Sequence, residues 1–333
     1  MDGTQHPGVP TASEFKDRRA GLLVFGILEI LFGVLAALMI ALMIAGQIMS
    51  AQLLHEPTPL RQIIPGAIVY GIIAGMLIVL GIGSCKTRRW ARSLSLIVAW
   101  SWLVVGLISI AATSLFLSSF LSAAQPPGQA LPASARVVAM IASMVCLGII
   151  FAVIPGILVF FYGSPHVKAT CEAHDPSPGW TDACPMPVLA LSLWLGFGAV
   201  TLLTLPLSTN GVIPFFGVLL SGVIGSLGCV GLAALWVYSA WVIYRLRLVG
   251  WWIVVVTVGV MTVSALVTFT RIDLLEMYRV MGYPERQIEL MQQYSFIRGN
   301  GVAWLSLGGA VPFLVYLVFV KRYFRSSGLH TVE

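Results

Sequence analysis

"GLLVFGILEILFGVLAALMIALMIA", residues 21–45, decides the fold class of this chain. The stretch carries a single charged side chain, Glu29, in a run of otherwise apolar and small residues. An α-helix needs about 20 apolar residues to cross the roughly 30 Å of hydrocarbon in a bilayer. The stretch therefore predicts a transmembrane helix. Because it is too long for the apolar core of a signal peptide, we expect it to be retained as a signal anchor.

The composition extends this prediction to the whole chain. Of its 333 residues, 58% are hydrophobic and 10% are charged, whereas soluble domains carry roughly 25% charged residues. We therefore expect lipid to be the solvent for most of the chain, and the predicted fold is an all-α, polytopic integral membrane protein. About eight spans are expected, over residues 21–45, 64–84, 93–121, 137–162, 187–206, 217–243, 250–270 and 300–320.

The sixth span is the hardest to delimit from the sequence. The apolar run begins near Val212 and continues past Tyr244, which is longer than one span needs. Pro214 within it predicts an interfacial turn or a tilted, over-long helix.

The distribution of Lys and Arg predicts the orientation. With the N-terminus in the cytoplasm, thirteen of the 19 basic residues lie on the cytoplasmic side. They are Lys16, Arg18, Arg19, Lys86, Arg88, Arg89, Arg92, Lys168, Arg245, Arg247, Lys321, Arg322 and Arg325. We expect a protein integral to a cytoplasmic (inner) membrane with both termini cytoplasmic. The net charge of +6 then reflects contact with the bilayer surface rather than with nucleic acid.

Matching segments in the two halves of the chain predict an internal duplication. "LEILFG" (28–33) resembles "LWLGFG" (193–198), which places Trp194 opposite Glu29, and "VIPGILV" (153–159) resembles "AVPFLVY" (310–316). Four spans per unit is an even number, so the two units would lie parallel, related by an axis along the membrane normal.

The resulting domain organisation has five parts. We predict a cytoplasmic tail over 1–19, a first four-helix unit over 20–163, a cytoplasmic linker over 164–186, a second four-helix unit over 187–322 and a cytoplasmic tail over 323–333. An extracytoplasmic helical hairpin is expected over 271–299, where Gly282 interrupts two amphipathic stretches and Pro284 begins the second.

Small residues four apart predict close helix packing in two spans, because in lipid the helices are held together by close contact of their backbones. The first set is Gly71 and Gly75; the second is Ser221, Gly225, Cys229 and Ala233. Packing within each bundle is the first interpretation. An interface between the halves or between protomers is the second.

Glu29 is the intramembrane polar candidate, being the only acidic residue well inside a predicted span. A charge at the bilayer centre costs roughly 2.5–3.5 kcal/mol or more, so such residues usually face a bundle interior. Two interpretations remain open. Glu29 could be a proton or cation site or an anchor for a partner, or it could be a protonated side chain hydrogen-bonded to Ser or Thr of a neighbouring helix. The lack of a second buried titratable group argues against a proton relay.

"HVKATCEAHDPSPGWTDACP", residues 166–185, is the candidate metal-binding segment. Its possible ligands are His166, Cys171, His174 and Cys184, residue types that zinc prefers. Their spacing is not that of a standard zinc finger, and a disulfide between the cysteines is disfavoured in a reducing cytoplasm. A connector with two free thiols is the first interpretation. No cofactor is expected, with zinc as the alternative.

Motifs of soluble catalysis are missing from the sequence: there is no Walker loop, dinucleotide fingerprint, H-E-x-x-H or G-x-S-x-G. We predict a non-enzymatic membrane subunit or scaffold, whose partners are the lipid bilayer and other membrane-protein subunits or further copies of itself. The alternatives are a small transporter or channel with a site between the two halves, supported by the Ser- and Thr-rich third and seventh spans, and a metal-binding sensor or enzyme.

Overall fold

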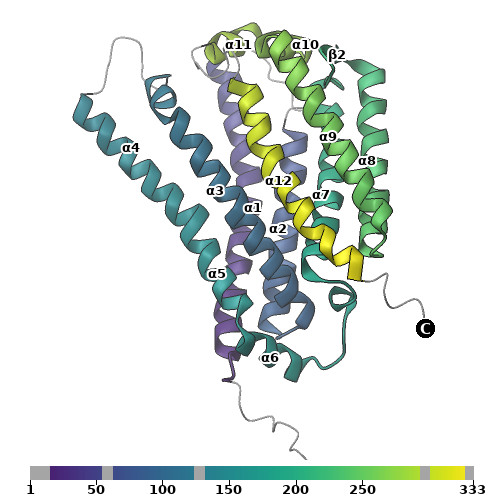
Figure 1. The fold of residues 1–333 in the computed structure, drawn as a ribbon. Helices are drawn as coiled ribbons and strands as arrows, with labels where there is room; N and C mark the ends of the chain where they lie inside the picture. Colours follow the sequence, from purple (N-terminus) through teal and green to yellow (C-terminus); the bar gives the residue numbers. More distant parts are fainter. Residues whose placement is uncertain (1–15, 55–62, 124–131, 293–300, 327–333) are drawn as a thin grey trace, which may run out of the picture.

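The structure, a computed structural model, describes residues 16–54, 63–123, 132–292 and 301–326. Figure 1 shows long helices running side by side, with shorter elements at the two ends. Parts of three predicted segments lie outside the described residues. They are residues 1–15 of the N-terminal tail, 293–299 of the helical hairpin and 327–333 of the C-terminal tail.

The helices that form the long segments are α1 (Arg19–Leu54), α2 (Ile64–Cys85), α3 (Arg89–Ala123), α4 (Ala133–Gly148), α5 (Ile154–Gly163), α7 (Met186–Thr209), α8 (Gly222–Tyr244), α9 (Leu248–Arg271) and α12 (Gly301–Ser326). α4 and α5 together make one of these segments. The shorter elements are η2 (Ile149–Val153), α6 (Pro165–His174), η3 (Trp180–Asp182), β1 (Ile213–Phe215), β2 (Val218–Leu220), α10 (Leu274–Val280) and α11 (Glu285–Met291).

Eight helices in the described part of the chain are long and apolar enough to cross a membrane, which agrees with the prediction from the sequence. They span Arg19–Met49, Ile64–Cys85, Arg89–Ser114, Ser134–Gly163, Met186–Thr209, Gly222–Tyr244, Leu248–Arg271 and Ser306–Phe324.

The fourth span is not a regular α-helix throughout. A π-helical turn, η2, joins α4 to α5, and the amide of Ile154 bonds to the carbonyl of Ile149, five residues back. Pro155 follows directly, and a proline has no amide hydrogen with which to continue the α-helical ladder. The proline therefore explains why this span changes its winding here.

Each half of the chain packs its helices in the same pairs. α1 packs most extensively on α2 and α7 on α8, while α3 packs on α5 and α9 on α12. Between the halves, α2 packs on α7. The indole Nε1 of Trp194 on α7 also donates a hydrogen bond of 2.7 Å to the Ser101 hydroxyl on α3.

Glycines set the close approach of α1 to α2, but they are not the glycines named from the sequence. A Cβ on Gly26 would lie 2.7 Å from the carbonyl oxygen of Gly81, and one on Gly33 would lie 3.0 Å from that of Ala74. Gly71 and Gly75 are exposed, and a Cβ on Gly75 would meet nothing within 4 Å. The spacing of four residues recurs on every face of a helix, so spacing alone could not select the packed face.

The second set of small residues does pack. Gly225, Cys229 and Ala233 are buried, and Ala233 clusters with Ala199 and Leu202 of α7. Ser221 is exposed and precedes the first turn of α8.

A β-hairpin, not a helix, occupies the start of the predicted sixth span. β1 and β2 pair antiparallel, with Phe215 opposite Val218, so that Phe216 and Gly217 form a two-residue turn. Both turn residues have positive φ angles, 46° and 87°, as the commonest tight hairpin turn requires. Of the two expectations for Pro214, the turn is present and the over-long helix is not, since α8 begins only at Gly222.

The predicted helical hairpin after the seventh span is present as α10 and α11. The Asp273 carboxylate accepts a hydrogen bond from the amide of Leu275 and so caps α10. Gly282 has a φ of 80° at the turn. Leu275 and Ile288 then bury against each other, which holds the two short helices together.

Candidate functional site

Glu29 takes part in a buried polar network that joins three helices of the first half. Its side chain is 5% exposed. The Ser84 hydroxyl of α2 donates a hydrogen bond of 3.1 Å to Glu29 Oε2. The Tyr162 hydroxyl of α5 in turn donates to Ser84 Oγ at 3.0 Å. A Glu bonded to a Ser of a neighbouring helix was one of the two arrangements expected from the sequence.

A fourth helix, α3, contributes two more polar side chains to this network. Arg92 is 8% exposed, and its Nε donates a hydrogen bond of 3.1 Å to the main-chain carbonyl of Tyr162. Ser95 is buried close to the Glu29 carboxylate, but its hydroxyl makes no hydrogen bond of good geometry with any described residue.

The network lies nearer the linker end of the bundle than the sequence predicted for Glu29. Ser84 is the penultimate residue of α2, and Tyr162 is the penultimate residue of α5. α1 has 36 residues, or about 54 Å at 1.5 Å per residue, which is far more than the hydrocarbon thickness. The start of α1 nevertheless lies beside the ends of α2 and α5, since Gly21 and Phe25 pack on Phe161, and the Glu29 carboxylate reaches Ser84 there.

This geometry can hold Glu29 in either protonation state. Hydroxyl groups both donate and accept, so Ser84 can give a hydrogen bond to a carboxylate or take one from a carboxylic acid. Each buried polar atom in such a network needs a partner, because an unpaired one costs about 1–3 kcal/mol. Ser84 is the residue on which the other two depend, since it touches both Glu29 and Tyr162.

Sequence reasoning found Glu29 but missed its partners. Ser84 and Tyr162 stand at span ends, where polar residues are common, and Arg92 was counted only toward orientation. The available signal was that three serines and three arginines lie within the short segment 84–95 that joins two apolar spans.

The linker is a folded element rather than a loose connector. α6 begins at Pro165, and its buried face includes Val167 and Cys171, which pack with Leu22 and Tyr162. The sequence favoured a turn-rich segment because of Pro176, Pro178 and Gly179. Those residues follow α6, so their effect is confined to the second part of the linker.

Ion pairs hold the linker against the basic turn between α2 and α3. Arg88 pairs with Asp175 at 3.5 Å, and Arg89 pairs with Glu172 at 3.5 Å and with Asp182 at 3.7 Å. Asp175 also accepts a hydrogen bond of 3.3 Å from the Arg89 amide, at the start of α3. Basic residues that predicted the orientation thus also bind the acidic residues of the linker.

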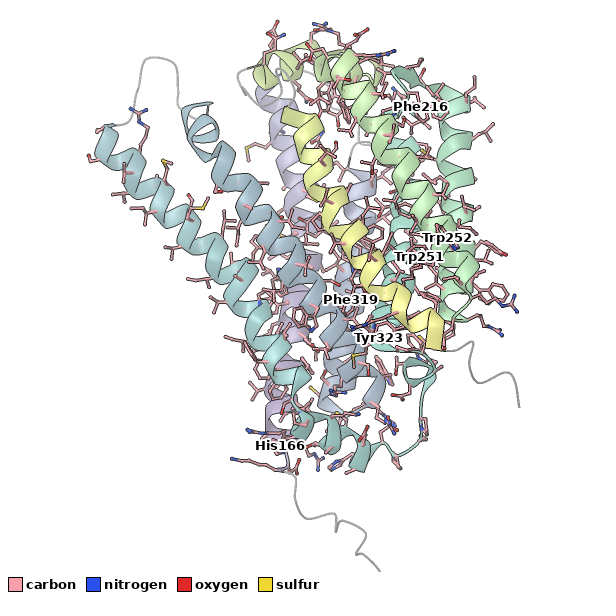
Figure 2. All side chains as sticks on the ribbon, in the orientation of Figure 1. His166, Phe216, Trp251, Trp252, Phe319 and Tyr323 are labelled. Carbon is pink, nitrogen blue, oxygen red and sulfur yellow. The ribbon has the colours of Figure 1, made fainter. Side chains whose placement is uncertain are left out.

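The four predicted metal ligands are not brought together. His166 lies at one end of the molecule (Figure 2), where its Nδ1 accepts a hydrogen bond of 3.4 Å from the Lys16 amide. His174 Nδ1 lies 2.9 Å from the Thr170 carbonyl, while Cys184 packs with Ile97 and Leu189. Within the described ranges, no three His, Cys, Asp or Glu side chains group together as metal ligands would.

The two cysteines of the linker are free thiols, and their burial makes them poor nucleophiles and poor metal ligands. Cys171 and Cys184 are buried, and burial raises the pKa of each to about 11. The thiolate is the form that binds metals and attacks electrophiles, so both side chains stay protonated near neutral pH.

Seven described Ser and Thr side chains of the third and seventh spans bond to backbone groups rather than to one another. Ser109, Ser114, Thr257, Thr262 and Thr270 donate to carbonyl groups of their own helices. Ser264 and Thr268 of α9 accept hydrogen bonds of 2.9 Å from the amides of Phe216 and Gly217, at the hairpin tip. Their structural role is therefore to satisfy backbone groups.

Comparison of the chain with protein families, with curated proteins and with solved structures finds no match in any of the three.

Proposed function

We propose that this chain is a non-enzymatic integral membrane protein that acts as a subunit or scaffold, packing against other membrane components. The observation that supports the proposal most is that α4 buries no described side chain against the rest of the bundle. Its described side chains from Pro132 to Ile154 include none that is buried, and most of them are apolar. Figure 1 shows α4 leaning away from the rest of the bundle.

A partner explains this helix better than lipid alone. A helix of a polytopic protein is held in place by packing one face against its neighbours, because lipid tails are as apolar as the helix itself. The last helix of the second half behaves in this way: Leu317 and Val320 of α12 are fully buried against α9. α4 lacks such a face, so we infer that a second membrane component supplies it.

We also infer two tandem, parallel four-helix units. Three backbone hydrogen bonds that end α2 recur at the end of α8 with the same spacing. After α2, the amides of Lys86, Thr87 and Arg88 donate to the carbonyls of Ile82, Ser84 and Gly83, in that order. After α8, the amides of Arg245, Leu246 and Arg247 donate to the carbonyls of Trp241, Ile243 and Val242, in that order. Thr87 and Leu246, at corresponding positions, both have positive φ angles.

Helix contacts support the same correspondence. Gly33 packs against Ala74 in the first half, and Ala199 packs against Ala233 in the second. This pairs Glu29 with Leu195, one residue beyond the Trp194 that the sequence match placed opposite it. Trp194 is 40% exposed and Leu195 is 1% exposed, so burial favours Leu195.

The two units differ in the polarity of their cores under this correspondence. Ser84, Arg92 and Ser95 match Ile243, Trp251 and Val254. The indole Nε1 of Trp251 donates a hydrogen bond of 2.8 Å to the main-chain carbonyl of Leu317 in α12. In the same way, Nε of Arg92 donates to the main-chain carbonyl of Tyr162 in α5. Leu195, Ile243, Trp251 and Val254 lie in one apolar cluster. The fold therefore does not need a polar core, and the network of the first unit points to a role beyond folding.

The basic residues support membrane insertion with both termini in the cytoplasm. Lys321 lies over the rings of Trp251 and Trp252, at 4.6 and 5.1 Å, near the end of α12. Arg322 lies 3.9 Å from the ring of Phe319. Aromatic and basic side chains together are typical of a membrane–water interface on the cytoplasmic side.

The two alternatives have less support. A carrier would place its polar groups between the halves, whereas Glu29 finds its partners within the first half. A zinc site would need converging ligands, and the linker histidines bond elsewhere.

Labelling of α4 tests the proposal. Single cysteines are placed along α4 from Val137 to Val145 in a Cys146→Ser background and labelled with a membrane-soluble maleimide. In native membranes we expect protection that repeats about every 3.6 residues, because a partner covers one face. In purified monomers, labelling should be uniform.

Val315→Cys and Val318→Cys in α12 serve as matched controls, since both positions are exposed on a helix whose other face is packed. They should label equally in membranes and in detergent. Uniform labelling of α4 in native membranes would contradict the scaffold proposal.

A further inference from the structure

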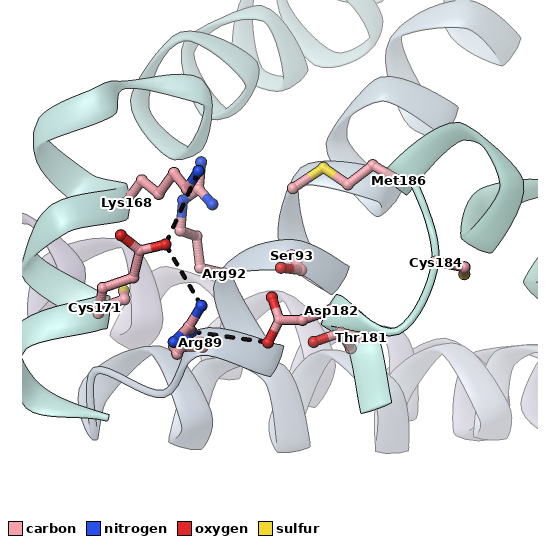
Figure 3. A pocket seen from close by; sticks show the side chains of 10 residues that line it. Arg89, Arg92, Ser93, Lys168, Cys171, Thr181, Asp182, Cys184 and Met186 are labelled. Carbon is pink, nitrogen blue, oxygen red and sulfur yellow. Dashed lines mark hydrogen bonds and ion pairs between the residues drawn. The ribbon is translucent and has the colours of Figure 1, made fainter. Parts of the chain in front are cut away.

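A pocket of about 190 Å³ lies where the linker meets the start of α3 (Figure 3). Its side chains come from four places in the chain: the first turns of α3, the middle of α6, the 3₁₀ turn η3 and the start of α7. The charged residues at its wall are Arg89, Arg92, Lys168, Glu172 and Asp182. The pocket is on the linker end of the bundle, next to the network of Glu29.

Two of the three cations at this pocket are already paired. Arg89 contacts both Glu172 and Asp182, and the Lys168 ammonium lies 3.9 Å from Glu172. The cations at the wall outnumber the anions by one, and Arg92 is the one left over. Within the described residues, no carboxylate lies within 4 Å of the Arg92 guanidinium.

Arg92 is buried despite this lack of an anionic partner. Only Nε has a hydrogen bond in the described structure, to the Tyr162 carbonyl, and a guanidinium carries five N–H donors. A buried charge is stable only when it is paired and hydrogen-bonded. The Nη groups make no hydrogen bond with a described residue and are not fully buried, and the pocket that Arg92 lines is the space beside them.

Thr181 provides a second, independent indication. It is 3% exposed, it lines the same pocket, and its hydroxyl has no hydrogen-bond partner among the described residues. Figure 3 shows Thr181 and Arg92 on opposite sides of the pocket, on η3 and on α3. Two buried side chains from distant parts of the chain thus line one cavity with polar groups that no described residue bonds, the Arg92 Nη groups and the Thr181 hydroxyl.

We propose that this pocket binds an anionic phosphate group, either that of an anionic phospholipid headgroup or free inorganic phosphate. Phosphate presents several acceptor oxygens and matches the planar fork of an arginine. A basic pocket at the membrane face is also where phosphate headgroups are available. This inference is independent of the scaffold proposal, because it concerns a different face of the molecule from α4.

The test measures binding by the purified full-length protein in detergent. Its thermal unfolding is followed by tryptophan fluorescence during titration with short-chain phosphatidylglycerol, with short-chain phosphatidylcholine and with inorganic phosphate, all at constant ionic strength. We expect a saturable rise in Tm with phosphatidylglycerol or with inorganic phosphate, and a smaller rise with phosphatidylcholine. A response to the lipid alone identifies the headgroup, and a response to phosphate identifies the free anion.

Two variants separate binding from folding. Thr181→Val keeps the shape of the side chain and removes a hydroxyl that has no partner, so without ligand it should not lower Tm. It should weaken binding about tenfold, which corresponds to one hydrogen bond of about 1.4 kcal/mol. Arg92→Gln should abolish the response. Lys86→Gln, at an exposed lysine outside the pocket, is the matched control and should leave binding unchanged.

The proposal is overturned if neither phosphatidylglycerol nor phosphate raises Tm above phosphatidylcholine or chloride. It is also overturned if Thr181→Val responds like the unaltered protein, or if Lys86→Gln weakens the response as much as Thr181→Val does, because the response would then reflect general surface charge. If Arg92→Gln does not fold, Thr181→Val and Lys168→Gln still decide the question.

Discussion

At the scale of single residues, the most informative side chain is Ser84. Its hydroxyl donates to Glu29 and accepts from Tyr162, so one small residue at the end of α2 joins α1 to α5. Under the proposed correspondence of the two units, the equivalent residues Leu195 and Ile243 lie in an apolar cluster. The comparison between the halves allows the cost of the polar core to be measured within one protein.

Ser84→Ala should lower the free energy of unfolding by about 1–3 kcal/mol, because it removes the hydroxyl that bonds both the Glu29 carboxyl and the Tyr162 hydroxyl. The triple variant Glu29→Leu, Ser84→Ala, Tyr162→Phe should recover most of this loss, since removing all members of a buried network can be nearly neutral. Denaturant unfolding in detergent measures both changes.

Ser109→Ala is the matched control for this series, because Ser109 is exposed and bonds only to the Val105 carbonyl of its own helix. It should change stability by less than about 0.5 kcal/mol. A triple variant that is less stable than Ser84→Ala would contradict the interpretation of a self-contained network.

At the scale of elements, the hairpin of β1 and β2 shows how an irregular segment is tolerated at the end of an apolar span. Backbone groups at membrane depth must be bonded within the protein. Ser264 and Thr268 of α9 bond the amides of Phe216 and Gly217, and the Ser264 hydroxyl also donates to the Pro214 carbonyl at 3.1 Å. Two hydroxyl groups one turn apart on α9 thus accept the hydrogen bonds of the two amides at the tip of the hairpin.

We predict that Ser264→Ala and Thr268→Val each destabilise the protein by about 1–3 kcal/mol, because each leaves a hairpin amide without an acceptor. The midpoint of thermal unfolding in detergent measures the effect. Thr257→Val, where the hydroxyl bonds only within α9, should have little effect. Equal losses in all three variants would show that the hairpin contact is not the cause.

At the scale of the whole molecule, the arrangement of eight long helices places both ends of the chain on one side if each helix crosses a bilayer once. The linker then lies on the same side as the termini, and α10 and α11 lie on the other (Figure 1). The bias of basic residues predicts which side is cytoplasmic.

Reporter fusions test this arrangement. Green fluorescent protein joined after residue 179 or after residue 333 should fluoresce, because it folds in the cytoplasm, and alkaline phosphatase joined at these points should be inactive. The reverse is expected for fusions after residue 292. Fluorescence at residue 292 together with active phosphatase at residue 179 would show the inverted orientation.

The sequence determined the number of long helices and their approximate bounds, because the hydrocarbon core imposes a length and a composition on any segment that could cross it. It also identified Glu29, because a charge in a long apolar run is conspicuous. These are local properties, and each can be read from one segment alone.

Only the tertiary structure decided which residues surround Glu29 and where the glycines pack. Ser84, Arg92 and Tyr162 belong to three different helices, and their meeting depends on how α2, α3 and α5 pack around the start of α1. Gly26 and Gly81 pack closely while Gly71 and Gly75 do not, because the packed face depends on the crossing of α1 and α2. Such choices depend on the relative positions of segments distant in the chain, which hydropathy does not encode.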